Sequence, residues 1–287
     1  REEGCSREEG CSREEGCSRE EGCSGEEGCR QAGLIVARRQ RLDAELVRRQ
    51  LVESRTDAGR AIEAGRVLVN GAVADKPARQ VHPGDAVVVA GPSPRFVSRG
   101  GDKLDAALTA FGLDVTGWRV LDAGASTGGF SDCLLQRGAA HVVALDVGHG
   151  QLHPRVRNDE RVTVLERFHI RDVEPDAIGG LVQLVTADLS FISITRVLPA
   201  LIRACEPGGH LVLLVKPQFE AGKAEVSKGH GVITDPAIHD RVRQEVHSAL
   251  IATGCDVLGW IDSPITGGDG NREFLVHATT DRPGFPA

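Results

Sequence analysis

Four ionisable residues stand where a parallel sheet would gather them at one edge. Asp188 closes the run VTAD, Lys216 closes LLVK, Glu273 begins EFLV, and Lys103 follows the glycine pair in RGGDK. In open α/β sheets the ligand crevice lies outside the carboxyl ends of the strands, so polar residues there face a common site. The sequence therefore predicts one Lys-Asp-Lys-Glu group. Ordinary salt bridges at a sheet edge are the competing interpretation.

The two lysines of this group matter because lysine is rare in the chain. There are five lysines among 34 basic residues, and the others are arginines. A guanidinium keeps its proton in a protein, whereas a partly buried ammonium can exchange its proton or act as a close point charge. Two such groups beside a hydroxyl favour its alkoxide, and two carboxylates can orient them. The group therefore suits activation of a hydroxyl nucleophile.

The stretch LDAGASTGGF, residues 121–130, follows the first expected strand of the region that contains these residues. A phosphate-binding P-loop would need a lysine and a hydroxyl residue after Gly129, and Phe130-Ser131 do not supply them, so this motif is excluded. A second interpretation is the GxSxG nucleophile elbow of α/β hydrolases, with Ser126 as the nucleophile. No HGGG-type segment precedes it.

A third interpretation of the same stretch is a turn that binds a nucleoside cofactor. Gly124 would let the backbone approach the ligand, and Asp146, at the end of the next expected strand, suits ribose hydroxyls. The pattern Asp-x-Gly-x-x-x-Gly-Gly resembles the S-adenosylmethionine loop of class I methyltransferases. That resemblance implies cofactor contacts from Asp122, Gly124, Ser126, Thr127, Gly128, Gly129, Phe130, Asp146 and Asp188.

Strands and helices are expected to alternate around these motifs. Apolar runs predict strands at 120–121, 141–145, 162–165, 184–187 and 211–215, with late strands at 256–261 and 272–279. Helices are expected at 102–111, 129–137, 194–204 and 236–252. Alternating β and α units favour an α/β fold with a doubly wound, mostly parallel sheet.

Residues 38–95 form a basic segment in an acidic chain, with eleven Lys or Arg against seven acids. Helices are expected at 42–47 and 58–64, the second capped by Thr56-Asp57 and ended by Gly65. The turn Asn70-Gly71 predicts a hairpin, and a last strand is expected at 85–90. This is a small α+β module whose arginines either bind RNA phosphates or form a solvated charged face.

The stretch SRTDAGRAIEAGRVLVNGAVADKPARQVHPGD, together with RLDAELV before it, resembles the S4 RNA-binding domain. The resemblance implies RNA contacts from Arg41, Arg48, Arg49, Arg55, Arg60 and Arg66. Aromatic residues are scarce, with eight Phe, two Trp and no Tyr. An RNA surface would therefore depend on arginine and backbone contacts more than on stacked rings.

The order of S4-like segment, VSRGGDKL, DAGASTGGF, ADLSFIS, VKPQFEAGK and GNREFL resembles the TlyA (hemolysin A) family over about residues 38–280. Lys103, Asp188, Lys216 and Glu273 match the K-D-K-E tetrad of FtsJ/RrmJ-like ribose 2'-O-methyltransferases, so the resemblance implies that they are catalytic. It implies S-adenosylmethionine-dependent 2'-O-methylation of cytidines in 16S and 23S ribosomal RNA. A class I, Rossmann-like methyltransferase fold, ribosomal RNA or ribosomal subunits as partners, and no metal are expected with it.

Four regions are expected along the chain: a disordered tail at 1–37, an S4-like domain at 38–90, an interdomain linker at 91–97 and the methyltransferase domain at 98–287. The tail repeats REEGCS four times, and such a repeat cannot bury an apolar face. It holds five of the eight cysteines. The other three are isolated, so neither a disulfide framework nor a zinc site is expected.

A cytoplasmic protein without a membrane partner is expected. No apolar run reaches the roughly 18 residues that span a bilayer, and the first residues contain no signal-peptide core. The hemolysin name suggests a cytolysin, which would require an apolar or strongly amphipathic segment. A hydrolase that uses Ser126 and a cytolysin are thus the alternatives to methyl transfer.

Overall fold

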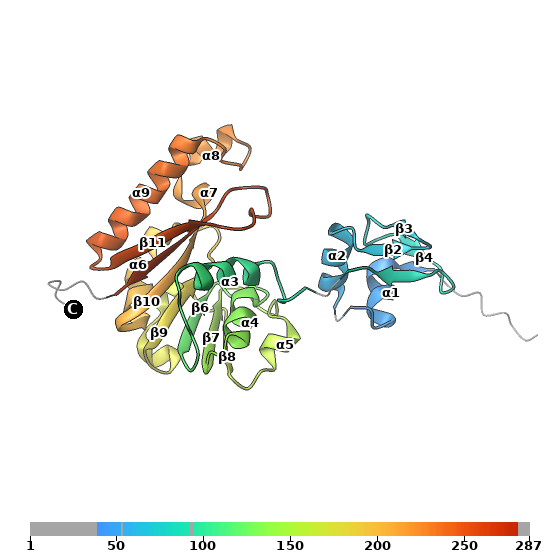
Figure 1. Ribbon diagram of the computed structural model, residues 1–287, viewed down its shortest axis with the longest axis horizontal. Helices are drawn as coiled ribbons and strands as arrows, with labels where there is room; N and C mark the ends of the chain where they lie inside the picture. The colour runs from blue at the N-terminus through green and yellow to red at the C-terminus, as the bar shows by residue number, and fades with distance from the viewer. Residues whose placement is uncertain (1–38, 53, 92–93, 281–287) are drawn as a thin grey trace, which may run out of the picture. The chain divides into compact units, whose positions relative to one another are not determined.

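A computed structural model divides the chain into two compact units, with the boundary after Gly91 (Figure 1). It describes residues 39–52, 54–91 and 94–280. The hexapeptide repeat, for which the sequence predicts disorder, lies outside the described residues.

The first unit consists of two short helices and two small sheets. Helices α1 (Leu42–Arg48) and α2 (Arg55–Glu63) share a core that contains Leu42, Leu46 and Ile62. The strands are β1 (Gln40–Arg41), β2 (Val67–Val69), β3 (Ala72–Val73), β4 (Gln80–Val81) and β5 (Val87–Val89). β2 is the centre of an antiparallel sheet with the order β3-β2-β5, and β1 pairs with β4.

The sequence predicts the hairpin turn of this unit correctly but the cap of its second helix incorrectly. Asn70 and Gly71 form the hairpin turn with φ of +52° and +81°, the positive pair that a type I′ turn requires. The predicted cap of the second helix is wrong, because α2 begins at Arg55 and its N-cap is Ser54. The Ser54 hydroxyl accepts the Asp57 N–H at 3.1 Å and donates to the Asp57 carboxylate at 2.6 Å. This reciprocal contact starts the helix three residues earlier than predicted.

The second unit is built on a seven-stranded sheet with the order β11-β12-β10-β9-β6-β7-β8. The strands are β6 (Arg119–Ala123), β7 (His141–Asp146), β8 (Val162–Glu166), β9 (Val182–Ala187), β10 (Cys205–Val215), β11 (Asp256–Asp262) and β12 (Phe274–Thr279). β6 to β10 run parallel, and β12 runs antiparallel to β10 and β11. The predicted α/β fold with a mostly parallel sheet is confirmed.

Helices cover both faces of this sheet. They are α3 (Gly100–Ala110), α4 (Gly129–Gln136), α5 (Pro154–Arg157), α6 (Leu198–Ala204) and α9 (Pro236–Ala252). Successive residues of a strand point to opposite faces. Val120 accordingly lies in the core with α3, α4 and α5, which Figure 1 shows grouped together, whereas Leu121 lies in the core with α6 and α9.

Three differences from the expected elements bear on the site. The helix expected at 194–204 is divided into a 3-10 turn, η3 (Ile194–Arg196), and α6, because Pro199 is tolerated in the first turn of a helix but not in its interior. The strand expected from 272 begins at Phe274, so Glu273 precedes it. Short helices α7 (Pro217–Glu220) and α8 (Lys223–Lys228) follow β10, too short to show a periodic pattern in the sequence.

Candidate active site

The four ionisable residues form two ion pairs, in which both lysines and Glu273 are buried and Asp188 is partly exposed. Lys103 Nζ donates to Glu273 Oε2 at 2.5 Å, and Lys216 Nζ lies 2.6 Å from Asp188 Oδ1. Lys216 Nζ also donates to Ser190 Oγ at 3.1 Å. Lys103 and Lys216 are each 8% exposed, and Glu273 is 4% exposed. Because a buried charge is stable only when it is paired, each carboxylate fixes the position of one ammonium group.

Strand register places these residues at one edge of the sheet. Val215, the last residue of β10, pairs with Phe274, the first residue of β12. Lys216 and Glu273 are the next residues beyond this pair, and Asp188 follows the last residue of the neighbouring strand β9. Lys103 reaches Glu273 from the first turn of α3. The structure thus brings all four side chains to the carboxyl edge of the parallel strands.

The loop after β6 approaches this edge through Gly124. Its φ is +83°, and a Cβ there would lie 2.6 Å from the carbonyl oxygen of Asp188, so only glycine fits. The Asp146 carboxylate accepts the N–H of Ser126 at 2.8 Å and the N–H of Gly148 at 2.6 Å. Asp146, the acid that the sequence assigns to ribose hydroxyls, therefore also fixes the backbone of the glycine loop.

Asp122 lies beneath the loop rather than at its surface. It is fully buried and accepts hydrogen bonds from Ser131 Oγ at 2.6 Å and Thr186 Oγ1 at 3.3 Å. Burial raises the pKa of Asp122 to about 7; the Ser131 hydrogen bond opposes this shift, and the charge of Asp188 adds to it. Asp122 therefore joins the end of β6 to α4 and to β9 in the protein interior.

The VSRGG segment, residues 97–101, leads into the first residues of α3 and packs tightly on the start of α4. A Cβ on Gly129 would collide with the Ser98 hydroxyl, and a Cβ on Gly101 would collide with the Phe96 ring. Val97 N–H donates to the Asp132 carboxylate at 2.8 Å. Phe96 and Val97, which the sequence places in the linker, are thus buried in the second unit. The turn, the glycine loop and the helix of Lys103 form one packed group.

A cavity of about 1330 Å³ opens beside the carboxyl edge. Of the residues singled out in the sequence, Gly124, Ser126, Asp146 and Asp188 line it. The remaining predicted site residues of the second unit are not among the residues that line it: Lys103, Asp122, Thr127, Gly128, Gly129, Phe130, Lys216 and Glu273. Lys216 contacts the wall through Asp188 and Ser190. Among the described residues, no cluster of three or more His, Cys, Asp or Glu could hold a metal ion.

Three apolar side chains at this cavity were not identified from the sequence. Val147 is 64% exposed and Phe191 is 92% exposed, and both line the cavity with Phe219. The rings of Phe191 and Phe219 lie 5.3 Å apart. Exposure of this kind depends on how loops pack, so no periodic pattern marks it. Clustered apolar groups that face solvent indicate a ligand surface.

This geometry supplies only part of what the hydrolase alternative requires. Ser126 has φ of +48° at a strand-to-helix turn, as a nucleophile elbow would. Its hydroxyl, however, contacts Gln151 Oε1 at 3.4 Å, and within the described residues no histidine bonds to it as a general base. No helix in the part of the chain that the structure describes is long and apolar enough to cross a membrane.

The arginines assigned to RNA all have acceptors within the first unit. Arg41 and Arg55 contact Asp43, Arg48 and Arg49 contact Glu45, Arg60 contacts Asp57, and Arg66 donates to the Ala90 carbonyl. Asp43 and Glu45 are buried. The hydrogen bond from Arg41 holds the pKa of Asp43 well below its usual range, and that from Arg48 lowers the pKa of Glu45 to about 2. Each ionised carboxylate therefore organises two guanidinium groups.

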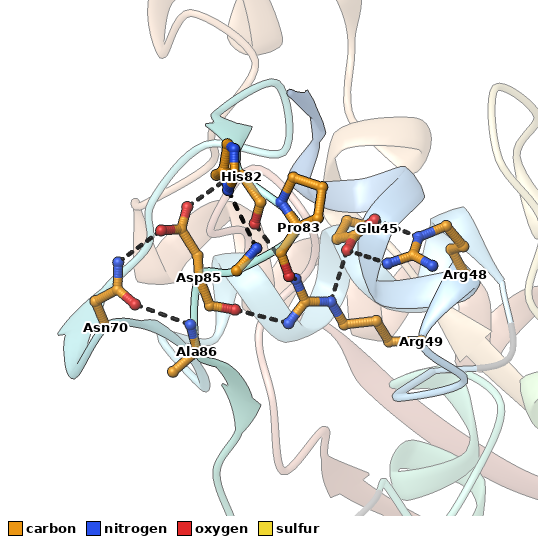
Figure 2. A network of polar contacts seen from close by, with 9 residues as sticks. Glu45, Arg48, Arg49, Asn70, His82, Pro83, Asp85 and Ala86 are labelled. Atoms are coloured by element: carbon orange, nitrogen blue, oxygen red, sulfur yellow. Dashed lines mark hydrogen bonds and ion pairs between the residues drawn. The ribbon is translucent and has the colours of Figure 1, made fainter. Parts of the chain in front are cut away.

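Arg49 differs from its neighbour Arg48 in what it contacts (Figure 2). Its guanidinium lies between Glu45 and the turn before β5, donating to Glu45 at 2.6 Å, to the Asp85 carbonyl at 2.7 Å and to the Pro83 carbonyl at 2.9 Å. The Arg49 side chain is 20% exposed and that of Arg48 is 55% exposed. Arg49 thus fastens α1 to the turn, whereas Arg48 remains open to solvent.

Comparison with known proteins relates both units to established families. Residues 96–280 match the FtsJ-like methyltransferase family, and residues 40–87 match the S4 domain. The 16S/23S rRNA (cytidine-2'-O)-methyltransferase TlyA of Mycobacterium tuberculosis is 51% identical over 250 residues, which cover 86% of this chain and 93% of that protein. The chain belongs to the TlyA (hemolysin A) family of FtsJ-like methyltransferases.

Other TlyA-family proteins match over shorter or comparable lengths. The 23S rRNA (cytidine-2'-O)-methyltransferase TlyA of Campylobacter jejuni is 33% identical over 187 residues, covering 63% of this chain and 70% of that protein. A solved structure from Streptococcus thermophilus, described as a hemolysin, has a TM-score of 0.68 and 41% identity, and covers 85% of this chain and 90% of that one. The chain is therefore an enzyme of the methyltransferase class with an S4 domain, as the sequence predicts.

Proposed function

We propose that this enzyme transfers a methyl group from S-adenosylmethionine to the ribose 2'-hydroxyl of cytidines in 16S and 23S ribosomal RNA. The observation that carries the proposal is the pair of buried lysine–carboxylate contacts beside the Gly124 loop. Burial of Lys103, Lys216 and Glu273 is costly, and replacement of buried ion pairs by apolar side chains is often as stable. A chemical role explains why they stand together at a ligand edge.

The glycine-loop side of the cavity fits the cofactor. S-adenosylmethionine supplies a methyl group on a positively charged sulfur. The chain offers a close backbone approach at Gly124, where a Cβ would fill the cradle, carboxylate acceptors at Asp146, and an exposed apolar side chain at Val147. These groups suit a nucleoside with ribose hydroxyls and a flat base. Gly124, Ser126, Asp146 and Val147 would hold it.

Lys216 is the residue best placed to act on the acceptor hydroxyl. Methyl transfer would exchange the methyl–sulfur bond for a new O–C bond, with the bonding electron pair left on sulfur. The 2'-O–H bond breaks as well, so a group beside the oxygen must take up the proton or stabilise the negative charge. Lys216 Nζ is oriented for this by Asp188 and Ser190. Lys103, held by Glu273, adds a second positive charge at the same edge. Such prior orientation removes much of the entropic part of the barrier.

Surface groups on both units support an RNA substrate. Phe191 presents an exposed ring at the cavity, and stacking of a base on such a ring contributes about 1–3 kcal/mol. In the first unit, Arg48 and Arg55 have side chains that are 55% and 61% exposed while buried acids hold their positions, which suits phosphate contacts. The substrate named for the relatives is ribosomal RNA. The enzyme would act in the cytoplasm, where ribosomes are.

Transfer of a labelled methyl group to undermethylated small and large ribosomal subunits tests this proposal. The wild-type enzyme should label cytidine riboses in both subunits, and Lys216→Ala should lower the rate by about 100-fold or more. Label in one subunit only would restrict the substrate to the RNA of that subunit. The relatives differ in this respect, since one is named for 16S and 23S rRNA and the other for 23S rRNA alone. Transfer unaffected by Lys216→Ala would refute the role of the tetrad. Ester hydrolysis that depends on Ser126 would favour the hydrolase.

A further inference from the structure

Glu220, the last residue of α7, joins two segments that follow different strands. Its Oε2 accepts a hydrogen bond from Ser193 Oγ at 2.6 Å, and its Oε1 accepts one from the backbone N–H of Ile194 at 2.8 Å. Ser193 and Ile194 belong to the segment after β9, whereas α7 follows β10. Glu220 is not part of the lysine–carboxylate tetrad or of the glycine loop.

Both segments carry groups on the acceptor side of the cavity. The segment after β9 carries Asp188 and Phe191, and the segment after β10 carries Lys216 and Phe219. The contact between Lys216 and Asp188 joins the two segments where they leave the sheet. Glu220 joins them again at their far ends. Contacts therefore join the two segments both before and after the phenylalanine residues in the chain.

The backbone conformation of Phe191 explains why the contact of Glu220 with Ser193 and Ile194 is needed. Its φ of +64° lies in the left-handed region, which is unfavourable for a bulky residue and persists only where the surroundings hold it. The ring is 92% exposed, so its own burial contributes little to holding this conformation. The neighbouring residues are held instead: Ser190 on one side by Lys216, and Ser193 on the other by Glu220.

We propose that Glu220 is a positioning residue, which holds Ser193 and Ile194 so that Phe191 keeps the strained backbone conformation that presents its ring to the substrate nucleoside. That the ligand of the Phe191 ring is a substrate nucleoside rests on the proposed function. The contact of Glu220 with Ser193 and Ile194 does not depend on it. Glu220 should affect the RNA more than the methyl donor, because its bonds go to Ser193 and Ile194 and not to Asp188 or the glycine loop. Burial raises the pKa of Glu220, which fits a carboxyl group whose hydrogen bonds face the protein.

Three variants separate the bonds that Glu220 makes from its charge. Glu220→Ala removes both acceptors. Glu220→Gln keeps an acceptor for the Ile194 N–H, and its amide can donate to the Ser193 hydroxyl, so it should restore most of the function. Ser193→Ala removes one bond from the other side. Glu160→Ala is the matched control, because this exposed carboxylate lies before β8 and does not line the cavity.

The full chain should be examined by hydrogen exchange, by calorimetric titration with S-adenosylmethionine and by steady-state kinetics on undermethylated subunits. In Glu220→Ala, exchange of the Ile194 amide and the KM for RNA should each rise about 10-fold, with kcat and the Kd of the donor changed less than about 3-fold. Glu220→Gln and Glu160→Ala should stay within about 3-fold of wild type. Ser193→Ala should add little to Glu220→Ala, because the two changes remove the same bond.

Unchanged Ile194 exchange or an unchanged KM for RNA in Glu220→Ala would overturn the proposal, as would an equal loss of donor affinity. Should Glu220→Ala fail to fold, Ser193→Ala carries the same test. A wild-type enzyme that transfers no methyl group would refute the proposed function, while exchange at Ile194 would still decide whether Glu220 holds the segment.

Discussion

Lys103 Nζ lies 2.5 Å from Glu273 Oε2, although 170 residues separate them along the chain. The contact joins the first turn of α3 to the residue that precedes β12, and the two side chains are 10% and 3% exposed. Removal of one partner leaves the other charge buried without compensation, which costs more than removal of both. Folding stability therefore requires only that neither charge is left unpaired, whereas methyl transfer is expected to require both residues. Single and double variants can separate these two effects.

Lys103→Met should lower the free energy of unfolding by about 3–5 kcal/mol, because Glu273 would remain buried and unpaired. The double variant Lys103→Met with Glu273→Leu should recover most of this stability, since no unpaired charge remains. Both proteins should lose methyl transfer by about 100-fold or more. Urea unfolding and labelled methyl transfer measure the two effects. Additive losses of stability in the double variant would show that the residues are not coupled.

The position of this edge could be predicted because strand ends are marked locally in the sequence. Asp188 and Lys216 each follow an apolar run, and in a parallel sheet the carboxyl ends of such runs lie together. Which lysine pairs with which acid could not be predicted. The pairing of Lys103 with Glu273 depends on where α3 lies over the sheet, and no spacing in the sequence records that.

Properties that depend on long-range packing were missed for the same reason. Phe191 looks like a core residue in ADLSFIS, yet its ring is exposed because the backbone turns through a left-handed conformation. Arg49 looks equivalent to Arg48, yet its guanidinium is engaged by carbonyls of a turn more than 30 residues further along the chain. Local sequence gives residue type and spacing, whereas exposure and hydrogen-bond partners come from segments that meet only in the fold.

Asp122→Asn should change how stability depends on pH. The pKa of Asp122 is raised to about 7 in the folded protein, against about 4 in an unfolded chain. The folded state therefore binds a proton that the unfolded state releases, and wild-type stability falls as pH rises from about 4 to about 7. Asparagine keeps one acceptor oxygen, its NH2 group can donate to the other hydroxyl, and it does not titrate. The difference between the two proteins should change by on the order of 3 kcal/mol across this window.

Denaturant unfolding at pH 5 and pH 8 measures this difference. The comparison between variant and wild type cancels every other titrating group, so a parallel pH dependence in the two proteins would contradict the shifted pKa of Asp122. Because Asp122 lies beneath the glycine loop and not in the cavity, the Kd of S-adenosylmethionine should change much less than stability does.

His277 should produce the opposite dependence on pH. Its ring is 5% exposed and lies 3.0 Å from His210, nitrogen to nitrogen. Burial, with a smaller effect from the charge of His210, lowers the pKa of His277 to about 4. The unfolded chain binds a proton near pH 6.5 that the folded protein excludes, so stability is lost as pH falls from about 6.5 to about 4. His277→Gln should remove on the order of 2 kcal/mol of this loss.

Thermal unfolding of wild type and His277→Gln at intervals between pH 4 and pH 7 checks this prediction. Glutamine can still bond to His210 but does not titrate in this range. An equally steep loss of stability in the variant would mean that His277 is not the group responsible. His210 lies in the same contact and its own pKa is lowered by burial, so His210→Gln is the informative second variant.

Arg48 and Arg49 should separate RNA binding from stability in the S4 domain. Arg48 is exposed, so Arg48→Ala should reduce the slope of log K against log salt for ribosomal RNA by about 0.7–0.9. It should lower the unfolding temperature less than Arg49→Ala does, because Arg49 still pairs with the buried Glu45 carboxylate. Arg49→Ala should lower the unfolding temperature of this domain with little change in slope, because it releases the turn before β5 from α1. Arg49→Lys should behave similarly, since an ammonium cannot reproduce the planar fork of donors. A reduced salt slope without loss of stability in Arg49→Ala would instead make Arg49 an RNA contact.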